Sequence, residues 1–298
     1  MNTAAQAFKA PIVDPSTIKE VADGVWVIPD LDRIPMVPNI GIIVGKRATL
    51  VIDTGFGRDN ARSVMEKARD LSGGRPIFLT HTHCHPEHGF GANVVADQVT
   101  VLYNTTQWGE LQEKGPAILQ MFRRQMPALA SLLEGVEFIR PDILYSESLT
   151  LDLGGGPVVD FHEFGGAHSR GDQAIIVRGS TSVLFTGDLI EEHHFGLIAD
   201  NESSVVEWIA RLDRFERMGP DIVVPGHGHI GGLELIAEYR AQFELSTRRV
   251  AELRAIGELS EAEICERVTR ELIEFRPDWD GHNWAAKTVS NLSWPSRA

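Results

Sequence analysis

The N-terminal part of the chain alternates short apolar runs with turn residues. Between Val25 and Gly55, three runs rich in Val and Ile predict three short strands. From Arg58 to Leu71 apolar residues recur at helical spacing, and the sequence Ser72-Gly73-Gly74 ends this predicted helix. The apolar run at 76–80 then predicts another strand. This order of elements indicates an α/β fold that opens with a β-meander.

In the middle of the chain, predicted strands lie on both sides of a long predicted helical segment. Strands are predicted at 100–104 and within 136–164, and 173–188 reads as a hairpin. These runs are largely apolar, which indicates sheets covered by helices on at least one face. The segment at about 105–135 is rich in Gln, Leu, Met and Ala, although a short connection would suffice there. We therefore predict an inserted helical cap over a site.

The C-terminal third is largely helical. An amphipathic helix is predicted over Ser203–Arg217, with Asn201 as its N-cap, and a long helix over Leu233–Ile256. Ser260 is followed three residues later by Glu263, a capping-box pattern that opens one more helix.

No repeat or low-complexity linker divides the sequence, so we predict one domain with additions at its ends. Residues 1–20 are an N-terminal extension, 21–258 the main domain, and 259–298 a C-terminal helical extension packed on it. The final stretch contains Pro277, Trp279, Trp284 and Trp294. It is predicted to be irregular but too aromatic for a disordered tail, and it suits a homodimer contact.

The composition excludes several classes of partner. The 298 residues include 28 Lys and Arg against 42 Asp and Glu, a net charge of −14, so a basic surface for nucleic acid or an anionic membrane is not expected. Met1–Ile18 has no apolar run suited to a signal peptide or membrane span, and a cytoplasmic location is expected. With only Cys84 and Cys265, a disulfide framework or Cys-based zinc site is improbable. Any metal must be held by nitrogen and oxygen.

The segment from His81 to Gly89, HTHCHPEHG, directly follows a predicted strand and concentrates metal-binding side chains. Four imidazoles and one carboxylate in such a short stretch suit a divalent metal. His83 and His85 lie two residues apart in an extended chain and can point the same way to bind one ion. Glu87 and His88, just beyond the next turn, can reach a second ion. The alternative interpretation is a surface His cluster without a metal.

Three more candidate ligands each follow a predicted strand. His168 lies in a glycine-flanked loop, Asp188 follows the strand at 182–185, and His227 follows the strand at 221–224. Loops at strand ends can bring distant residues together at one edge of a sheet core. Taken singly, either His could bond only to backbone, and Asp188 could be a turn or N-cap residue.

These motifs, in this order and with VIDTG upstream, resemble the metallo-β-lactamase superfamily from about Val25 to Leu235. The resemblance implies a four-layer αββα sandwich of two mixed sheets flanked by helices. It also implies two metal ions, with Asp188 bridging them and Asp53 accepting a hydrogen bond from a ligating imidazole. The implied ligands of the first metal are His83, His85 and His168, and those of the second are Glu87, His88 and His227.

Two details of the motif affect this assignment. His81 and His83 also have the two-residue spacing, but that register would place a ligand at Pro86, which cannot bind metal. His81 is therefore predicted to be structural. The superfamily usually has Asp where this chain has Glu87, and the longer side chain changes the reach toward the second metal. Cys84 is expected to be buried, because neighbouring residues of an extended chain face opposite sides.

The resemblance implies hydrolysis. Two divalent cations about 3.5–4 Å apart would lower the pKa of a shared water, and the resulting metal-bridging hydroxide would be the nucleophile. Asp188 would orient this hydroxide, and His194 is a candidate for protonating the leaving group. Zinc is the favoured metal, with iron or manganese as alternatives.

Candidate substrate-binding side chains lie on the loop after the first predicted strand, on the inserted helix and after Asp188. They are Ile34, Met36, Trp108, Met121 and His193. The alternative is that the apolar ones pack on one another and that His193 and His194 belong to the surface or the core.

The predicted function is cleavage of an ester-like bond in a small molecule: a lactone, a thioester or a carboxylic ester. Alkylsulfatase-like, phosphodiesterase-like and β-lactamase-like activities are the alternatives. A non-catalytic metal-binding protein and a di-iron protein that handles oxygen or nitric oxide are less favoured, the second because His85 stands where that branch carries an acid.

Overall fold

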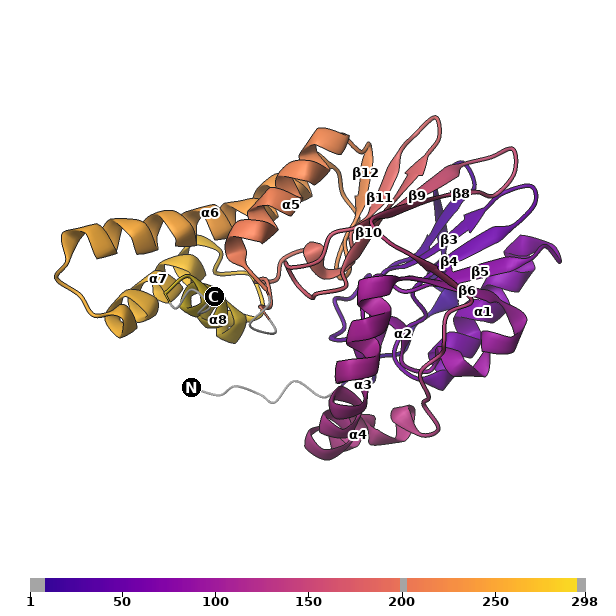
Figure 1. The fold of residues 1–298 in the computed structure, drawn as a ribbon, viewed down its shortest axis with the longest axis horizontal. Coiled ribbons are helices and arrows are strands. Elements are labelled where there is room, and N and C mark those ends of the chain that lie inside the picture. The colour runs from indigo at the N-terminus through magenta and orange to yellow at the C-terminus, as the bar shows by residue number, and fades with distance from the viewer. Residues whose placement is uncertain (1–8, 199–202, 294–298) are drawn as a thin grey trace.

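The computed structural model describes residues 9–198 and 203–293. Its strands form two β-sheets that pack face to face (Figure 1). The first sheet has seven strands in chain order. Its strands are β1 (Lys19–Ala22), β2 (Val25–Ile28), β3 (Ile40–Val44), β4 (Thr49–Ile52), β5 (Ile77–Thr80), β6 (Thr100–Asn104) and β7 (Ile143–Tyr145). Pairing is antiparallel from β1 to β4 and parallel from β4 to β7. The predicted opening meander is present, with β1 as a strand that the sequence pattern did not indicate.

The second sheet has five strands in the order β12-β11-β10-β9-β8. They are β8 (Ser148–Asp152), β9 (Val158–Glu163), β10 (Gln173–Arg178), β11 (Val183–Phe185) and β12 (Ile222–Val224). Strands β8 to β11 pair antiparallel, and β11 pairs parallel with β12. Both sheets are therefore mixed, and the predicted hairpin at 173–188 is confirmed.

Apolar side chains from both sheets form the central core. Ile43, Leu50 and Ile52 of the first sheet share one cluster with Phe161 and Ile175 of the second, all fully buried. Helix α1 (Arg58–Ser72) covers the outer face of the first sheet. Helices α5 (Val205–Met218) and α6 (Leu233–Ile256) cover the outer face of the second. The predicted four-layer αββα sandwich is confirmed.

The strand directions place several strand ends at one edge of the sandwich. Strands β4 and β5 are parallel, and β9 and β11 run the same way because each is antiparallel to β10. Strand β12 is parallel to β11. The two sheets meet at this edge, where the amide of Gln173 donates to the carbonyl of Thr82 at 3.0 Å. Loops that leave these strands are thus brought together.

The predicted helical insert is helical in the structure. Helix α3 (Thr105–Gln125) follows β6 directly, with Asn104 as its N-cap, and the short helix α4 (Pro127–Ala130) follows it. The apolar side of α3 packs on a cluster that includes Cys84 and Phe90, which lie on either side of the short helix α2 (Pro86–Gly89). The insert is therefore anchored next to the His-rich segment.

The C-terminal part differs from expectation at two points. Helix α5 begins at Val205 with Ser204 as its N-cap, whereas the expected N-cap Asn201 lies outside the described residues. The segment expected to be irregular contains helix α8 (His282–Ser293), where Ala285 and Val289 are both fully buried. Ala285 and Val289 lie four residues apart on one face of the helix, but the aromatic residues around them made this helical spacing difficult to recognise in the sequence. Trp294 lies outside the described residues.

Helices α6, α7 (Glu261–Phe275) and α8 extend away from the sandwich (Figure 1). The predicted capping box is present at the start of α7, where Ser260 and Glu263 each accept the other's backbone N–H. The apolar side chains of these helices join one continuous core with the outer face of the second sheet. Among the described residues, no helix combines the length and apolar character needed to cross a membrane.

Candidate metal centre

The His-rich segment turns sharply at the end of β5 because of its own sequence. Pro86 occupies the first turn of α2, where its lack of an N–H costs nothing. The turn folds His88 back over His83, so that their ring centroids lie 4.2 Å apart. The rings of His83 and His85 lie 4.6 Å apart.

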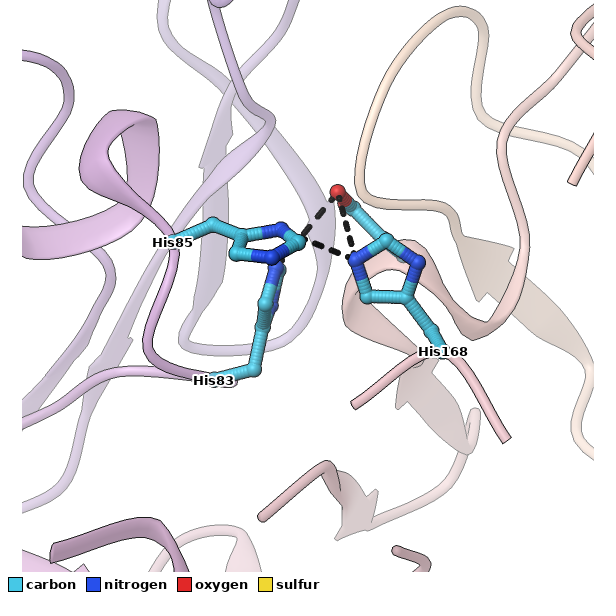
Figure 2. Close-up of side chains that lie close together, drawn as sticks. His83, His85 and His168 are labelled. Carbon is cyan, nitrogen blue, oxygen red and sulfur yellow. Dashed lines mark hydrogen bonds and ion pairs between the residues drawn. The ribbon is translucent and has the colours of Figure 1, made fainter. Parts of the chain in front are cut away.

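His83, His85 and His168 form the first group together with Asp188. One nitrogen or oxygen atom of each lies within 4.8 Å of those of the others. The Nε2 atoms of His83 and His168 lie 3.5 Å and 3.7 Å from Asp188 Oδ2. Figure 2 shows the three imidazoles converging from two backbone segments, one with His83 and His85 and the other with His168. His168 comes from the loop between β9 and β10, so residues far apart in sequence share one point in space.

Glu87, His88 and His227 form the second group, which also includes Asp188 within the same 4.8 Å limit. Here the Nε2 atoms of His88 and His227 lie 3.2 Å and 3.5 Å from Asp188 Oδ1. One carboxylate oxygen thus faces each group of imidazoles. All seven side chains that the resemblance indicated are brought together, in two groups joined by Asp188.

The donor set fits two small divalent cations. His83 Nε2, His88 Nε2 and Glu87 Oε2 are buried atoms without a hydrogen-bond partner. Buried polar atoms are normally paired, so a group of unpaired ones indicates a ligand. Ligands about 2.0–2.2 Å from a tetrahedral zinc ion lie roughly 3.3 Å from one another, close to the separations seen here.

Burial and neighbouring charges shift the pKa values of the cluster residues in different directions. Burial lowers the pKa of His83 well below its usual value and that of His168 to about 3, so both rings present a free lone pair. Burial alone would raise the pKa of Asp188, but His88 and His227 hold it well below its usual range. Burial also disfavours protonated His227, yet the Asp188 carboxylate outweighs it and raises that pKa to about 9. Asp188 is therefore an ionised carboxylate among imidazoles.

Asp53 makes the hydrogen bond expected of it. The residue follows β4 with a φ of 65°, and its Oδ2 accepts a hydrogen bond from His88 Nδ1 at 2.8 Å. The amide of Thr82 donates to Asp53 Oδ1 at 2.7 Å, which holds the carboxylate in place. Because Nδ1 of His88 is occupied, Nε2 is the nitrogen that faces Asp188.

Replacing Asp53 by Ala should weaken metal binding about 10–100-fold, because His88 loses the partner that fixes its ring and tautomer. Competition with a chelator of known affinity measures this. The exposed Asp59 of α1, replaced by Ala, is the control and should bind metal like the wild type. Equal affinities in the two variants would show that Asp53 has no such role.

Two residues of the His-rich segment point away from the cluster. His81 Nδ1 pairs with the hydroxyl of Tyr103 at 2.7 Å, and burial lowers the pKa of this ring to about 4. A Cβ at Gly89 would lie 2.4 Å from the His81 ring, so glycine is required for this packing. Cys84 is buried in the apolar cluster under α3. Both positions agree with the structural roles expected from the sequence.

The candidate substrate-binding residues occupy mixed positions. Ile34 is half-buried against the core outside the first sheet, and Met36 and Trp108 are half-buried against the cluster under α3. Met121 on the same helix is 42% exposed. His193 instead stacks on Trp279 of the C-terminal extension and lies 3.3 Å from Glu192. None of these contacts joins a side chain of the set to the two ligand groups.

His194, the candidate proton donor, packs on the C-terminal extension. Its ring centroid lies 4.2 Å from that of Trp284, and its Nδ1 donates to the carbonyl of Phe195 at 3.0 Å. Burial lowers the pKa of His194. Its role in proton transfer stays a prediction.

Sequence reasoning missed the residues that hold the His168 loop. The carboxylate of Asp172 accepts from the amides of His168 at 3.0 Å and Ser169 at 2.7 Å. Glu110 of α3 accepts from the amide of Gly171 at 2.8 Å. An Asp four residues after a His in a glycine-rich loop is a local signal that could have been found, because short acidic side chains bond nearby amides. Glu110 carries no such signal, since its partner is 61 residues away.

Comparisons with known proteins agree with this geometry. The family model of the Metallo-beta-lactamase superfamily matches residues 33–227. The chain is 25% identical to the metallo-beta-lactamase type 2 of Bacteroides fragilis, over 76% of this chain and 84% of that protein. It is 26% identical to the linear primary-alkylsulfatase of Pseudomonas sp. (strain ATCC 19151), over 66% of this chain and 43% of that protein.

Solved structures show the same fold. The stereoselective inverting sec-alkylsulfatase Pisa1 from Pseudomonas sp. superposes with a TM-score of 0.70 and 19% identity, covering 92% of this chain and 49% of its own. A metallo-beta-lactamase from Pontibacter korlensis gives 0.61 and 16%, covering 76% and 98%. This chain thus spans less than half the length of the alkylsulfatases it matches. From the family match and the shared fold, the chain belongs to the metallo-beta-lactamase superfamily of metal-dependent hydrolases.

Proposed function

We propose that the chain is a dinuclear metal-dependent hydrolase that cleaves an ester-like bond of a small molecule. The observation that carries this proposal is the Asp188 carboxylate, whose two oxygens each face a different group of imidazoles. His83, His85 and His168 would hold one cation, and Glu87, His88 and His227 the other. A carboxylate that faces both groups suits a pair of cations acting on one substrate.

When bound, two such cations lower the pKa of a water molecule and polarise the scissile group. The chain's own residues prepare the site for this chemistry. Asp53 accepts a hydrogen bond from Nδ1 of His88, so that Nε2 is the nitrogen that faces Asp188, while Asp172 fixes the loop that presents His168. Among the candidate ligands, only Glu87 and Asp188 carry negative charge against the four positive charges of two divalent cations. The loaded site would stay positive and favour an anionic transition state despite the acidic chain.

A carbonyl ester, lactone or thioester is the first candidate substrate class. Half-buried apolar side chains beside the His-rich segment support it: Met36 and Trp108 pack against the cluster that contains Cys84 and Phe90. We propose that these side chains, with Ile34 and the exposed Met121, bind the apolar part of the substrate. Zinc is the favoured metal, because imidazole and carboxylate are its common ligands.

A sulfate ester is the second candidate, favoured by the extent of the fold similarity. Pisa1 covers 92% of this chain, whereas the metallo-beta-lactamase from Pontibacter korlensis covers 76%. The part of this chain that does not align with Pisa1 is shorter than the stretch from α6 to α8. At least part of the C-terminal helices is therefore included in the structural similarity. A sequence relative is also an alkylsulfatase by name.

A hydrolysis panel tests these proposals and separates them. The purified chain, loaded with zinc, manganese or iron, should bind two cations and cleave an activated carboxylic ester, thioester or lactone. A chelator should abolish the turnover, and added metal should restore it. Cleavage of alkyl sulfates alone would select the second candidate. Turnover that is undiminished after complete metal removal would falsify the proposed mechanism.

A further inference from the structure

Among the candidate ligands, His227 has a more exposed side chain than His83, His88 and His168. Its side chain is 17% exposed, against at most 1% for His83, His88 and His168. A partly exposed ring needs another restraint to keep its orientation. That restraint is the carbonyl of Val37, which accepts a hydrogen bond from His227 Nδ1 at 2.9 Å. With Nδ1 occupied, Nε2 is directed at Asp188.

The loop that carries His227 has a glycine on each side of this residue. They are Gly226 and Gly228, and the second of these has a φ of 83°. A Cβ at Gly226 would lie 2.0 Å from Asp188 Oδ1, so the close approach requires glycine. Glycine gives the backbone many accessible conformations, and a loop built on it must be fixed by outside contacts.

Asn39, directly before β3, supplies several of these contacts, in addition to the backbone bonds that join Gly226 and His227 to the segment at 187–192. Its Nδ2 donates to the carbonyls of Pro225 and Gly228, both at 2.9 Å, and so holds the loop on either side of His227. Its own amide donates to the carbonyl of Gly226 at 2.8 Å. Asn39 is 3% exposed, so little water competes for these bonds.

Asp30 completes the connection between the two loops. Its amide donates to Asn39 Oδ1 at 2.9 Å, and its Oδ2 accepts from the amide of Gly228 at 3.2 Å. Both polar atoms of the Asn39 side chain, Oδ1 and Nδ2, therefore have hydrogen-bond partners. The segment that contains Val37 and the loop that contains His227 are held as one unit, although 190 positions separate these two residues.

We propose that Asn39 is a positioning residue that holds the His227 loop and thereby sets the affinity of the group formed by Glu87, His88 and His227 for its cation. The inference rests on the proposed metal site, because the orientation of His227 matters only if its Nε2 binds a cation. Asn39 does not touch the cation or the substrate. It acts through His227 and the carbonyl of Val37.

The experiment compares two buried asparagines with the same bonding pattern. Asn60 also donates to two carbonyls, those of Pro11 and Phe56, and accepts from one amide, that of Val13. It is 4% exposed and contacts none of the candidate ligands through these bonds. Asn39→Ala should weaken the binding of one of the two zinc ions about 10–100-fold, the effect expected from loss of an outer partner. Asn60→Ala should leave both affinities unchanged.

Zinc titration against a competing chelator measures both affinities without reference to activity. In a His227→Ala background, Asn39→Ala should have no further effect on zinc binding, because both changes act on the same ligand. If Asn39→Ala fails to fold, Asn39→Asp replaces it. The added negative charge would by itself attract a cation, so weaker binding in this variant supports positioning, and tighter binding overturns it.

The outcomes separate this inference from the proposed function. If the wild type fails to bind two zinc ions, the proposed metal site is wrong. If the wild type binds two zinc ions and Asn39→Ala binds both with the affinities of the wild type, the positioning role is wrong. Equal weakening by Asn39→Ala and Asn60→Ala, or an undiminished effect in the His227→Ala background, would show a general loss of structure and would also overturn the inference.

Discussion

Asp188→Asn should lower turnover by more than about 100-fold, the upper end of the loss seen when only an outer partner of a metal ligand is removed. The carboxylate lies 3.2–3.7 Å from four imidazole nitrogens and places one oxygen toward each group. An amide of the same shape has one oxygen and no charge, so it can serve one cation at most. The zinc content should fall from two ions per chain to one or none. Metal analysis and turnover of the best substrate measure both effects.

The control for this prediction is Asp160→Asn. Asp160 is also a largely buried carboxylate, but it pairs with Arg178 on the second sheet and with no candidate ligand. This variant should keep both zinc ions and its turnover, whatever stability it loses. If Asp188→Asn retains two zinc ions and full activity, the central role given to the shared carboxylate is wrong.

Trp208→Ala should lower the free energy of unfolding by about 3–5 kcal/mol, the range for removing a large aromatic side chain from a core. Trp208 of α5 is fully buried, and its ring centroid lies 4.8 Å from that of Phe243 on α6. Its indole N–H donates to the carbonyl of Leu189 at 3.0 Å. The ring centroid of His168 lies 5.9 Å away, so the cavity would open behind a candidate ligand. Urea unfolding of the metal-free protein measures the loss.

Val206→Ala is the matched control, because Val206 lies on the same helix but is 63% exposed. A surface substitution of this kind should change the unfolding free energy by no more than about 0.5 kcal/mol. Trp208→Phe should fall between the two, since it keeps most of the volume but leaves the Leu189 carbonyl without its donor. Similar losses in Trp208→Ala and Val206→Ala would contradict the packing assigned to α5.

The elements that local patterns specify could be predicted. The helix over Leu233–Ile256 and the capping box at Ser260 and Glu263 depend on spacing within a few residues, and both are present. The N-cap of α5 was misplaced because several polar residues precede it, and the bond that identifies Ser204 is visible only in the folded chain. Helix α8 was missed because its buried face is small, and its burial comes from packing on α6 and α7.

Sequence alone was sufficient to nominate the seven candidate ligands, because histidines at two-residue spacing after a strand, and single His or Asp residues after others, are local features. Their convergence required the order and direction of the strands. Residues 83, 168, 188 and 227 meet because β5, β9, β11 and β12 end at the same edge of two packed sheets.

Only the tertiary structure decided how the site is held. The division of the Asp188 oxygens between two groups, the support of His168 by Glu110, and the support of the His227 loop by Asn39 are contacts between distant parts of the chain. Several of them end on backbone carbonyls and amides, such as the carbonyl of Val37. Every residue has a backbone carbonyl and every residue except proline has a backbone N–H, so no residue type in the sequence marks which of these groups a fold will use.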